Sequence, residues 1–204
     1  MKKLILFISF LSASCLYAQG VFLESGMNFT TYNYKSPGSK TTDNIQSGNG
    51  LFLRAGLGCC CLRRCSRGNR RKFSYGIALN KYNATGGNGF EKYDWDVTHI
   101  GGFAQWTNYF GDDDSFFFNV AFDLSSMIDG KQTLGSQTFK LSEYDEFKGI
   151  WGGPRGGFGY QVISTNNTFL EVGYAIQVSL NLSGGSDESL NFTTHQLGIK
   201  LNLQ

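Results

Sequence analysis

The last ten residues of the chain, HQLGIKLNLQ at 195–204, alternate between apolar and polar side chains. Leucine or isoleucine occupies every second position from Leu197 to Leu203, with glycine, lysine and asparagine between them. Side chains of a β-strand point alternately to its two faces, so this segment has one apolar face and one polar face. An apolar face that points inward would belong to a soluble sandwich or barrel. An apolar face that points outward would place the protein in a membrane.

The same period of two recurs along the whole chain after residue 20. No window has the periodicity of an amphipathic helix, so the sequence predicts an all-β chain of eight strands. Paired glycines blur the phase of the fourth and sixth segments. The eight segments are 21–29, 51–58, 73–80, 94–110, 116–124, 147–162, 169–182 and 195–204.

The connections between these segments alternate in length. The long ones follow the first, third, fifth and seventh strands and span 34–50, 83–93, 127–146 and 183–189. The others are shorter: a basic turn at 63–72, then 111–115 and 164–167. Long loops at one rim, with short turns and both termini at the other, are typical of outer-membrane barrels.

The face opposite the apolar stripe decides which side points inward. It carries mostly Gly, Ala, Ser and Asn, with about one charged residue on each strand. A surface in water would be rich in Lys and Glu, whereas the inside of an eight-stranded barrel has room only for packed side chains. We therefore place the polar face inside and the apolar face in lipid. The predicted fold is an eight-stranded antiparallel up-and-down transmembrane β-barrel.

The first twenty residues have the layout of a secretory signal peptide. Lys2 and Lys3 precede an apolar run from Leu4 to Leu11, and small residues lead to Ala18. We expect a signal peptide at 1–18 and a barrel domain at 19–204. The alternative is a lipoprotein signal with Cys15 as the lipidated residue. No run of about 18 apolar residues follows, so no membrane-spanning helix is expected.

The charge balance argues against a nucleic-acid partner. The chain has 18 Lys and Arg and 16 Asp and Glu, and Lys2 and Lys3 leave with the signal peptide. The remaining 16 basic residues match the 16 acidic ones, so the mature chain is formally neutral.

Charged residues on the predicted interior form the candidate site. Closing the barrel puts the last strand beside the first and seventh strands, so Lys200 would lie between Glu24 and Glu171. Because a buried charge must be paired, we expect the cluster to pair across the lumen as a structural plug. A proton or ion path is the alternative. The predicted interior charge cluster is Glu24, Arg54, Arg155, Glu171 and Lys200, with Asp123 on the same face.

Neither a metal site nor a cofactor is predicted. Neighbouring cysteines on a strand point to opposite faces, and the spacing of Cys59, Cys60, Cys61 and Cys65 is not that of a zinc site. A disulfide to Cys65 remains an alternative. His99 and His195 lie in no local motif of His, Ser and an acid, so no catalytic residues are predicted.

Two rims carry residues suited to contacts outside the barrel. The turn that holds Arg63, Arg64, Arg67, Arg70, Arg71 and Lys72 is expected to be a solvated rim. Pairing with the acidic run 112–114, or contact with anionic headgroups or peptidoglycan, is the alternative. In the long loops, Tyr32 and Tyr93 are expected in an interfacial aromatic belt, and Phe139 in a partner contact.

The signal, the eight alternating strands, the long odd-numbered loops and the terminal LGIKLNLQ resemble the small outer-membrane β-barrel proteins of Gram-negative bacteria, of the OmpX and OmpA type. The resemblance implies an integral outer-membrane protein inserted by the barrel-assembly machinery and surrounded by outer-membrane lipid and lipopolysaccharide. It implies a structural, adhesive or surface-interaction role through the extracellular loops, toward a ligand that the sequence does not name, with no catalysis. A lipid A acyl-modifying enzyme and a narrow pore are the alternatives.

Overall fold

The computed structural model describes residues 20–35, 45–60, 71–87, 92–111, 114–165, 168–183 and 189–203. The predicted signal peptide lies outside these residues. No helix in the described part of the chain is long and apolar enough to cross a bilayer. The strands are β1 (Gly20–Lys35), β2 (Gln46–Cys60), β3 (Arg71–Lys81), β4 (Ala84–Gly86), β5 (Tyr93–Phe110), β6 (Phe116–Leu134), β7 (Gln137–Lys140), β8 (Ile150–Ser164), β9 (Thr168–Asn181) and β10 (Ser189–Leu203).

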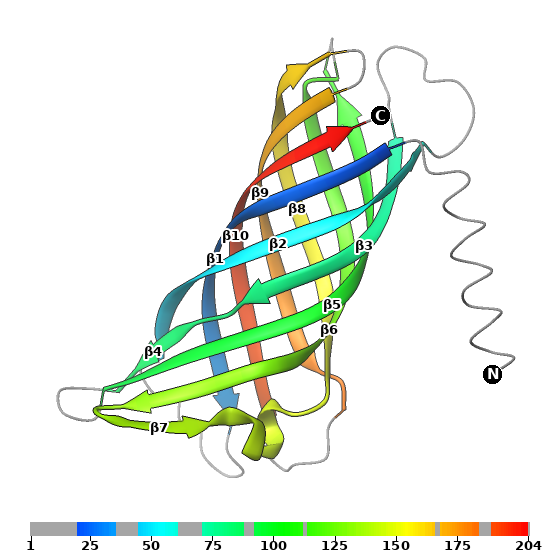
Figure 1. Cartoon of the computed structure of the whole chain (residues 1–204). Helices are drawn as coiled ribbons and strands as arrows, with labels where there is room; N and C mark the ends of the chain where they lie inside the picture. The colour runs from blue at the N-terminus through cyan, green and yellow to red at the C-terminus, as the bar shows by residue number, and fades with distance from the viewer. Residues whose placement is uncertain are drawn as a thin grey trace, which may run out of the picture.

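Eight long strands close into an antiparallel barrel (Figure 1). Each long strand pairs with the next along the chain, and β10 returns to pair with β1 from Val21 opposite Leu203 to Lys35 opposite Ser189. The strand ends at Gly20 and Leu203 therefore lie at one rim, which we call the terminal rim. The predicted fold class is confirmed.

The barrel wall continues beyond the predicted strands at the opposite rim. Residues 127–146 were expected to form a loop, but β6 runs on to Leu134 beside β5, and β7 pairs back onto β6. Two short 3-10 turns, η2 (Leu141–Glu143) and η3 (Asp145–Phe147), then lead to β8. The sequence did not reveal these elements because the first part of β5 supplies backbone partners for β6 regardless of side-chain pattern. We use the name extension for this part of the barrel, at the rim opposite the terminal rim. It comprises β7, η2, η3 and the ends of the long strands around them.

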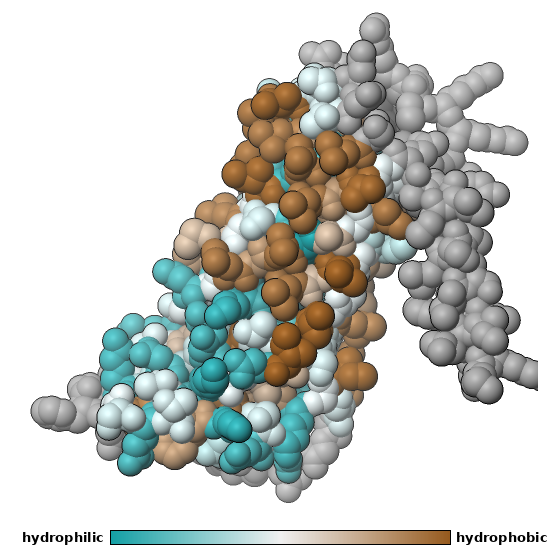
Figure 2. Space-filling model, in the orientation of Figure 1, coloured by the Kyte–Doolittle hydropathy of each residue, from teal (hydrophilic) through white to brown (hydrophobic). Residues whose placement is uncertain are grey.

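An apolar band surrounds the barrel next to the terminal rim. Ile77 is 65% exposed, Val120 58% and Ile199 55%, and Leu53 and Val172 also point outward, as predicted. Figure 2 shows apolar side chains gathered toward the terminal rim and polar ones over the extension. Soluble proteins rarely expose continuous apolar patches of more than a few hundred Å², so this band is built to contact lipid.

The interior has the opposite arrangement. Inside the band it combines buried charged and polar side chains with aromatic rings, whereas inside the extension it is an apolar cluster, which we call the outer plug. Tyr32 belongs to the plug, 4% exposed, and its hydroxyl donates a hydrogen bond to the carbonyl oxygen of Tyr82 at 2.9 Å. Its expected place in an interfacial belt is wrong, because position 32 continues the inward phase of β1. The plug consists of Tyr32, Tyr82, Ala84, Val97, Leu141, Phe147, Trp151, Leu190 and Phe192.

Candidate functional site

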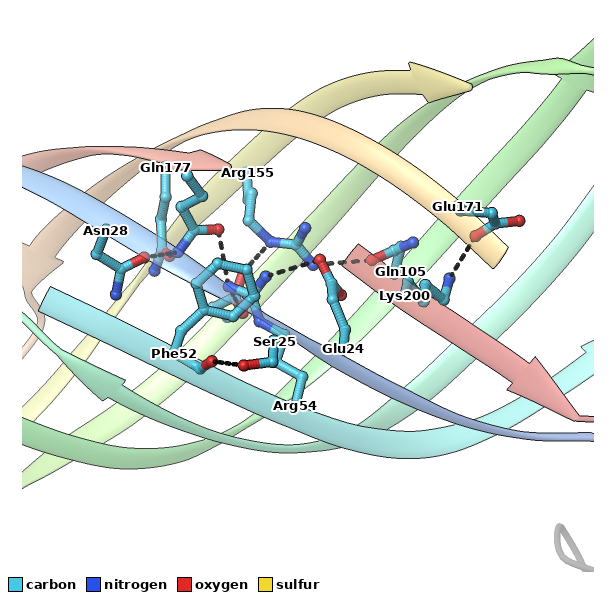
Figure 3. Close-up of polar contacts among 12 residues, drawn as sticks. Glu24, Ser25, Asn28, Phe52, Arg54, Gln105, Arg155, Glu171, Gln177 and Lys200 are labelled. Carbon is cyan, nitrogen blue, oxygen red and sulfur yellow. Dashed lines mark hydrogen bonds and ion pairs between the residues drawn. The ribbon is translucent and has the colours of Figure 1, made fainter. Parts of the chain in front are cut away.

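The five predicted cluster residues come from five strands and point into the lumen (Figure 3). The strand register explains why they meet. Glu24 on β1 lies opposite both Arg54 on β2 and Lys200 on β10, and Lys200 lies opposite Glu171 on β9. Arg155 approaches from β8 on the far side of the barrel. Four of the five are at most 6% exposed, and the side chain of Glu24 is 16% exposed.

Two arginines share the carboxylate of Asp123 in the middle of the lumen. Its Oδ2 lies 3.2 Å from Arg155 Nε, and its Oδ1 lies 3.8 Å from Arg54 Nη2. Glu24 Oε1 lies 3.8 Å from Arg54 Nη1. The guanidinium groups also donate hydrogen bonds to two glutamine side chains, Gln105 at 2.8 Å and Gln196 at 3.0 Å. Asp123 is therefore the residue that joins the two cations.

A second ion pair lies nearer the terminal rim. Lys200 Nζ is 3.6 Å from Glu171 Oε2, and the Tyr109 hydroxyl donates a hydrogen bond to Glu171 Oε1 at 2.7 Å. The ammonium group of Lys200 also lies 4.6 Å from the centre of the Phe22 ring. Glu171 thus combines one ion pair with one short hydrogen bond.

Lys72 is an interior residue that the sequence analysis assigned to the basic turn. It is 6% exposed and donates a hydrogen bond to Asn202 Oδ1 at 2.8 Å across the lumen. Position 72 shares the inward phase of β3 with Ser74 and Ala78, and that phase was the signal that could have identified it. Lys72 was assigned to the turn because a run of arginines precedes it in the sequence.

Aromatic rings fill most of the space around these charges. Phe22, Phe52, Phe117 and Phe169 are buried in the lumen, and the Arg54 guanidinium lies 4.9 Å from the centre of the Phe52 ring. A cavity of about 20 Å³ remains between the two charge groups. That volume holds about one water molecule. Within the described part of the chain, aromatic and charged side chains fill the lumen around the cluster.

We expect the reconstituted protein to show no steady ion conductance in a planar bilayer. Glu171→Gln removes the carboxylate beside Lys200 but leaves the aromatic filling and the outer plug in place, so it should open no path either. Single-channel recording of both proteins checks this. A stable conductance in the unmodified protein would contradict a closed lumen and favour the ion path.

The two histidines lie in different environments. His99 is 1% exposed, and its Nδ1 is 3.1 Å from Ser125 Oγ. The rings of Tyr82, Trp151 and Phe192 surround His99, and no hydrogen bond joins it to a carboxylate among the described residues. His195 is on the outer face, hydrogen-bonded to the Tyr174 hydroxyl. The structure does not assemble His, Ser and an acid at either place.

Several predicted features lie outside the described residues. These are Cys61, Cys65, Arg63, Arg64, Arg67, Arg70, Asp112 and Asp113, and the side chains of Cys59 and Cys60. Arg71 is described and is exposed at the start of β3. No group of three or more His, Cys, Asp or Glu residues suited to a metal ion occurs in the described part of the chain.

Comparison with known proteins finds similarity in shape only. No protein-family model matches the chain, and no curated protein matches it in sequence. The crystal structure of Neisserial surface protein A aligns at TM-score 0.47 and 16% identity, over 90% of this chain and 96% of that one. Ail, the attachment invasion locus protein of Yersinia pestis, gives 0.37 and 13% over 90% and 99%. The outer membrane protein AlkL gives 0.35 and 10% over 92% of each chain.

Proposed function

We propose that this chain is an integral outer-membrane protein that acts through the surface of its extension, with the barrel as a closed anchor and not as a catalyst. The observation that carries the proposal is the change of the outward face along β10. On β10 this face is apolar from Leu203 to Leu197 and then becomes His195, Thr193 and Asn191. The ordered chain continues where the lipid-facing band ends.

Buried residues of the outer plug hold the backbone of the extension in place beneath its exposed surface. Leu141 is 1% exposed and Phe147 7%, so both ends of the segment from η2 to η3 are anchored in the outer plug. Phe139 and Tyr144, which flank Leu141, are 39% and 47% exposed. Exposed aromatic residues on an ordered backbone are suited to partner contacts, because little conformational freedom is lost on binding.

The orientation follows from the lengths of the connections. Bacterial barrels have short turns and both termini on the periplasmic side. The terminal rim would therefore face the periplasm and the extension the outside of the cell. Lipopolysaccharide would surround the outer part of the band, and the barrel-assembly machinery would insert the chain.

An epitope inserted between Gly135 and Ser136 should be stained by antibody on intact cells. The matched insertion after Thr165, at the terminal rim, should require permeabilised cells.

The surface role is tested on cells that display the barrel. We expect Phe139→Ser combined with Tyr144→Ser to remove any adhesion of these cells to immobilised matrix proteins that the unmodified chain confers. Lys131→Ser, also on the extension, is the control. Equal adhesion of the double variant and the unmodified chain would contradict a contact through these aromatics. Staining of both epitopes only after permeabilisation would contradict the orientation itself.

The segment 127–146 contains a buried residue, so a deletion within it would disturb the fold as well as the surface. A deletion of 131–143, within the segment that the sequence predicted to be a loop, would remove Leu141 from the outer plug and every paired residue of the β6–β7 hairpin. Surface substitutions at Phe139 and Tyr144 avoid that damage.

A further inference from the structure

A groove opens on the outer face of the barrel near the terminal rim. Its volume is about 540 Å³, and it crosses β3, β5 and β6. Trp106 is 55% exposed, Val120 58% and Phe118 48%, so its walls are large apolar side chains that point away from the barrel. Arg71 and Asn108 are the polar residues of its lining.

The register arranges these residues in two rows across the strands. Arg71, Asn108 and Phe118 lie opposite one another in the row nearer the rim. Trp106 and Val120 lie opposite one another in the next row, toward the middle of the band. The groove therefore has a polar mouth at the rim and an apolar continuation toward the membrane centre.

Small outward residues follow the groove along β5. The next outward positions after Trp106 are Ala104 and Gly102, whereas the neighbouring strands carry Ile77 and Phe122 at this level. A Cβ added at Gly102 would contact only the carbonyl oxygen of Gly76, at 3.5 Å. The outward side chains of β5 at this level are thus smaller than those of the neighbouring strands, which leaves space for an acyl chain, and we call this strip over Ala104 and Gly102 the trough.

The trough has the depth of one membrane leaflet. From Asn108 to Gly102 the strand runs six residues, which is about 20 Å at about 3.3 Å per residue. A strand tilted by about 40° in the membrane then covers about 15 Å of depth, half of the hydrocarbon core of about 30 Å. A single acyl chain fits this path from the rim to the membrane centre.

The mouth of the groove carries positive charge. Arg71 is exposed, and no salt bridge joins it to a carboxylate within the described residues. A guanidinium group can bind two phosphate oxygens at once, and tryptophan favours the membrane–water interface.

We propose that this groove binds one anionic phospholipid of the periplasmic leaflet. The phosphate lies on Arg71, the glycerol backbone lies beside Asn108 and Trp106, and one acyl chain lies in the trough over Ala104 and Gly102. The assignment to the periplasmic leaflet rests on the proposed function, because that function sets the orientation of the terminal rim.

The fluorescence of Trp106 can report lipid bound in the groove. Of the three tryptophans, Trp151 is 1% exposed inside the outer plug, and Trp95 packs against Tyr32 and Phe147. Trp106 is the tryptophan that faces lipid. The full mature chain is reconstituted into phosphatidylcholine vesicles that contain phosphatidylglycerol, and either lipid carries brominated acyl chains. Preferential quenching of tryptophan fluorescence by the brominated phosphatidylglycerol reports its occupancy of the groove.

We expect phosphatidylglycerol to be preferred about fivefold over phosphatidylcholine, as one basic residue at an anionic surface gives. Arg71→Gln should bring this ratio close to one, and Lys81→Gln at the opposite rim should leave it unchanged. Ala104→Phe fills the trough and should lower quenching by both lipids.

Different results would contradict the phospholipid site and the proposed function. Equal quenching by the two lipids in the unmodified protein, or an unchanged ratio in Arg71→Gln, overturns the phospholipid site while the barrel remains a membrane protein. An absence of quenching by either lipid means that the band does not contact lipid, and this outcome overturns the proposed function as well.

Discussion

Asp123→Asn is expected to lower the free energy of unfolding by about 3–5 kcal/mol, because it leaves two buried cations without their shared carboxylate. Arg155 would lose its ion pair at 3.2 Å and keep its hydrogen bond to Gln105. Arg54 would keep Glu24, at 3.8 Å, and Gln196. Urea-induced unfolding of the barrel in detergent micelles, followed by tryptophan fluorescence, measures the change.

Asp129→Asn is the matched control on the same strand. Asp129 pairs with Lys131 at 3.5 Å, but both side chains are more than half exposed. Exposed ion pairs contribute about 0–1 kcal/mol, so this substitution should change the unfolding free energy little. Equal losses in the two variants would show that the lumen charges are as well solvated as those on the surface, and the account of a filled lumen would then be wrong.

The strand phase could be predicted because lipid and lumen impose opposite chemistry on alternate residues. Leu53 and Arg54 are neighbours in sequence, yet one contacts the outside and the other is fully buried. A shift of one residue would reverse both, so the apolar period fixes the inward side throughout the band. Antiparallel register then brings Glu24, Arg54 and Lys200 together without further information.

The extension could not be predicted in the same way, because the environment there is reversed. Outside the extension is water and inside it is the apolar plug, so the outward face of β5 carries Asp94 and Asp96 while Val97 is buried. At this boundary β6 carries one extra residue, Ile128, between the partners of His99 and Thr98, so the inward phase of β6 changes between Asp123 and Gly130. The apolar period that marks the lipid-facing band therefore does not continue through it, and the extension has the composition of a loop.

The orientation of the faces is tested most directly on β10. Ile199, between Leu197 and Leu201 on the outward face, is 55% exposed. An arginine that faces lipid near the bilayer midplane costs about 2–4 kcal/mol in barrels, and near the interface about 0–1 kcal/mol. Ile199→Arg should therefore lower the free energy of folding into phosphatidylcholine vesicles by about 2–4 kcal/mol, as measured by urea titration.

Asn191→Arg provides the control, since it places the same side chain on the same face of the same strand. Asn191 lies eight residues closer to the extension, opposite Asn33 of β1, in the polar part of the outward face. Its substitution should cost no more than about 1 kcal/mol, because the guanidinium group reaches water there. If both arginines cost the same, the outward face has no depth-dependent apolar environment. The band around Ile199 would then not lie in a bilayer.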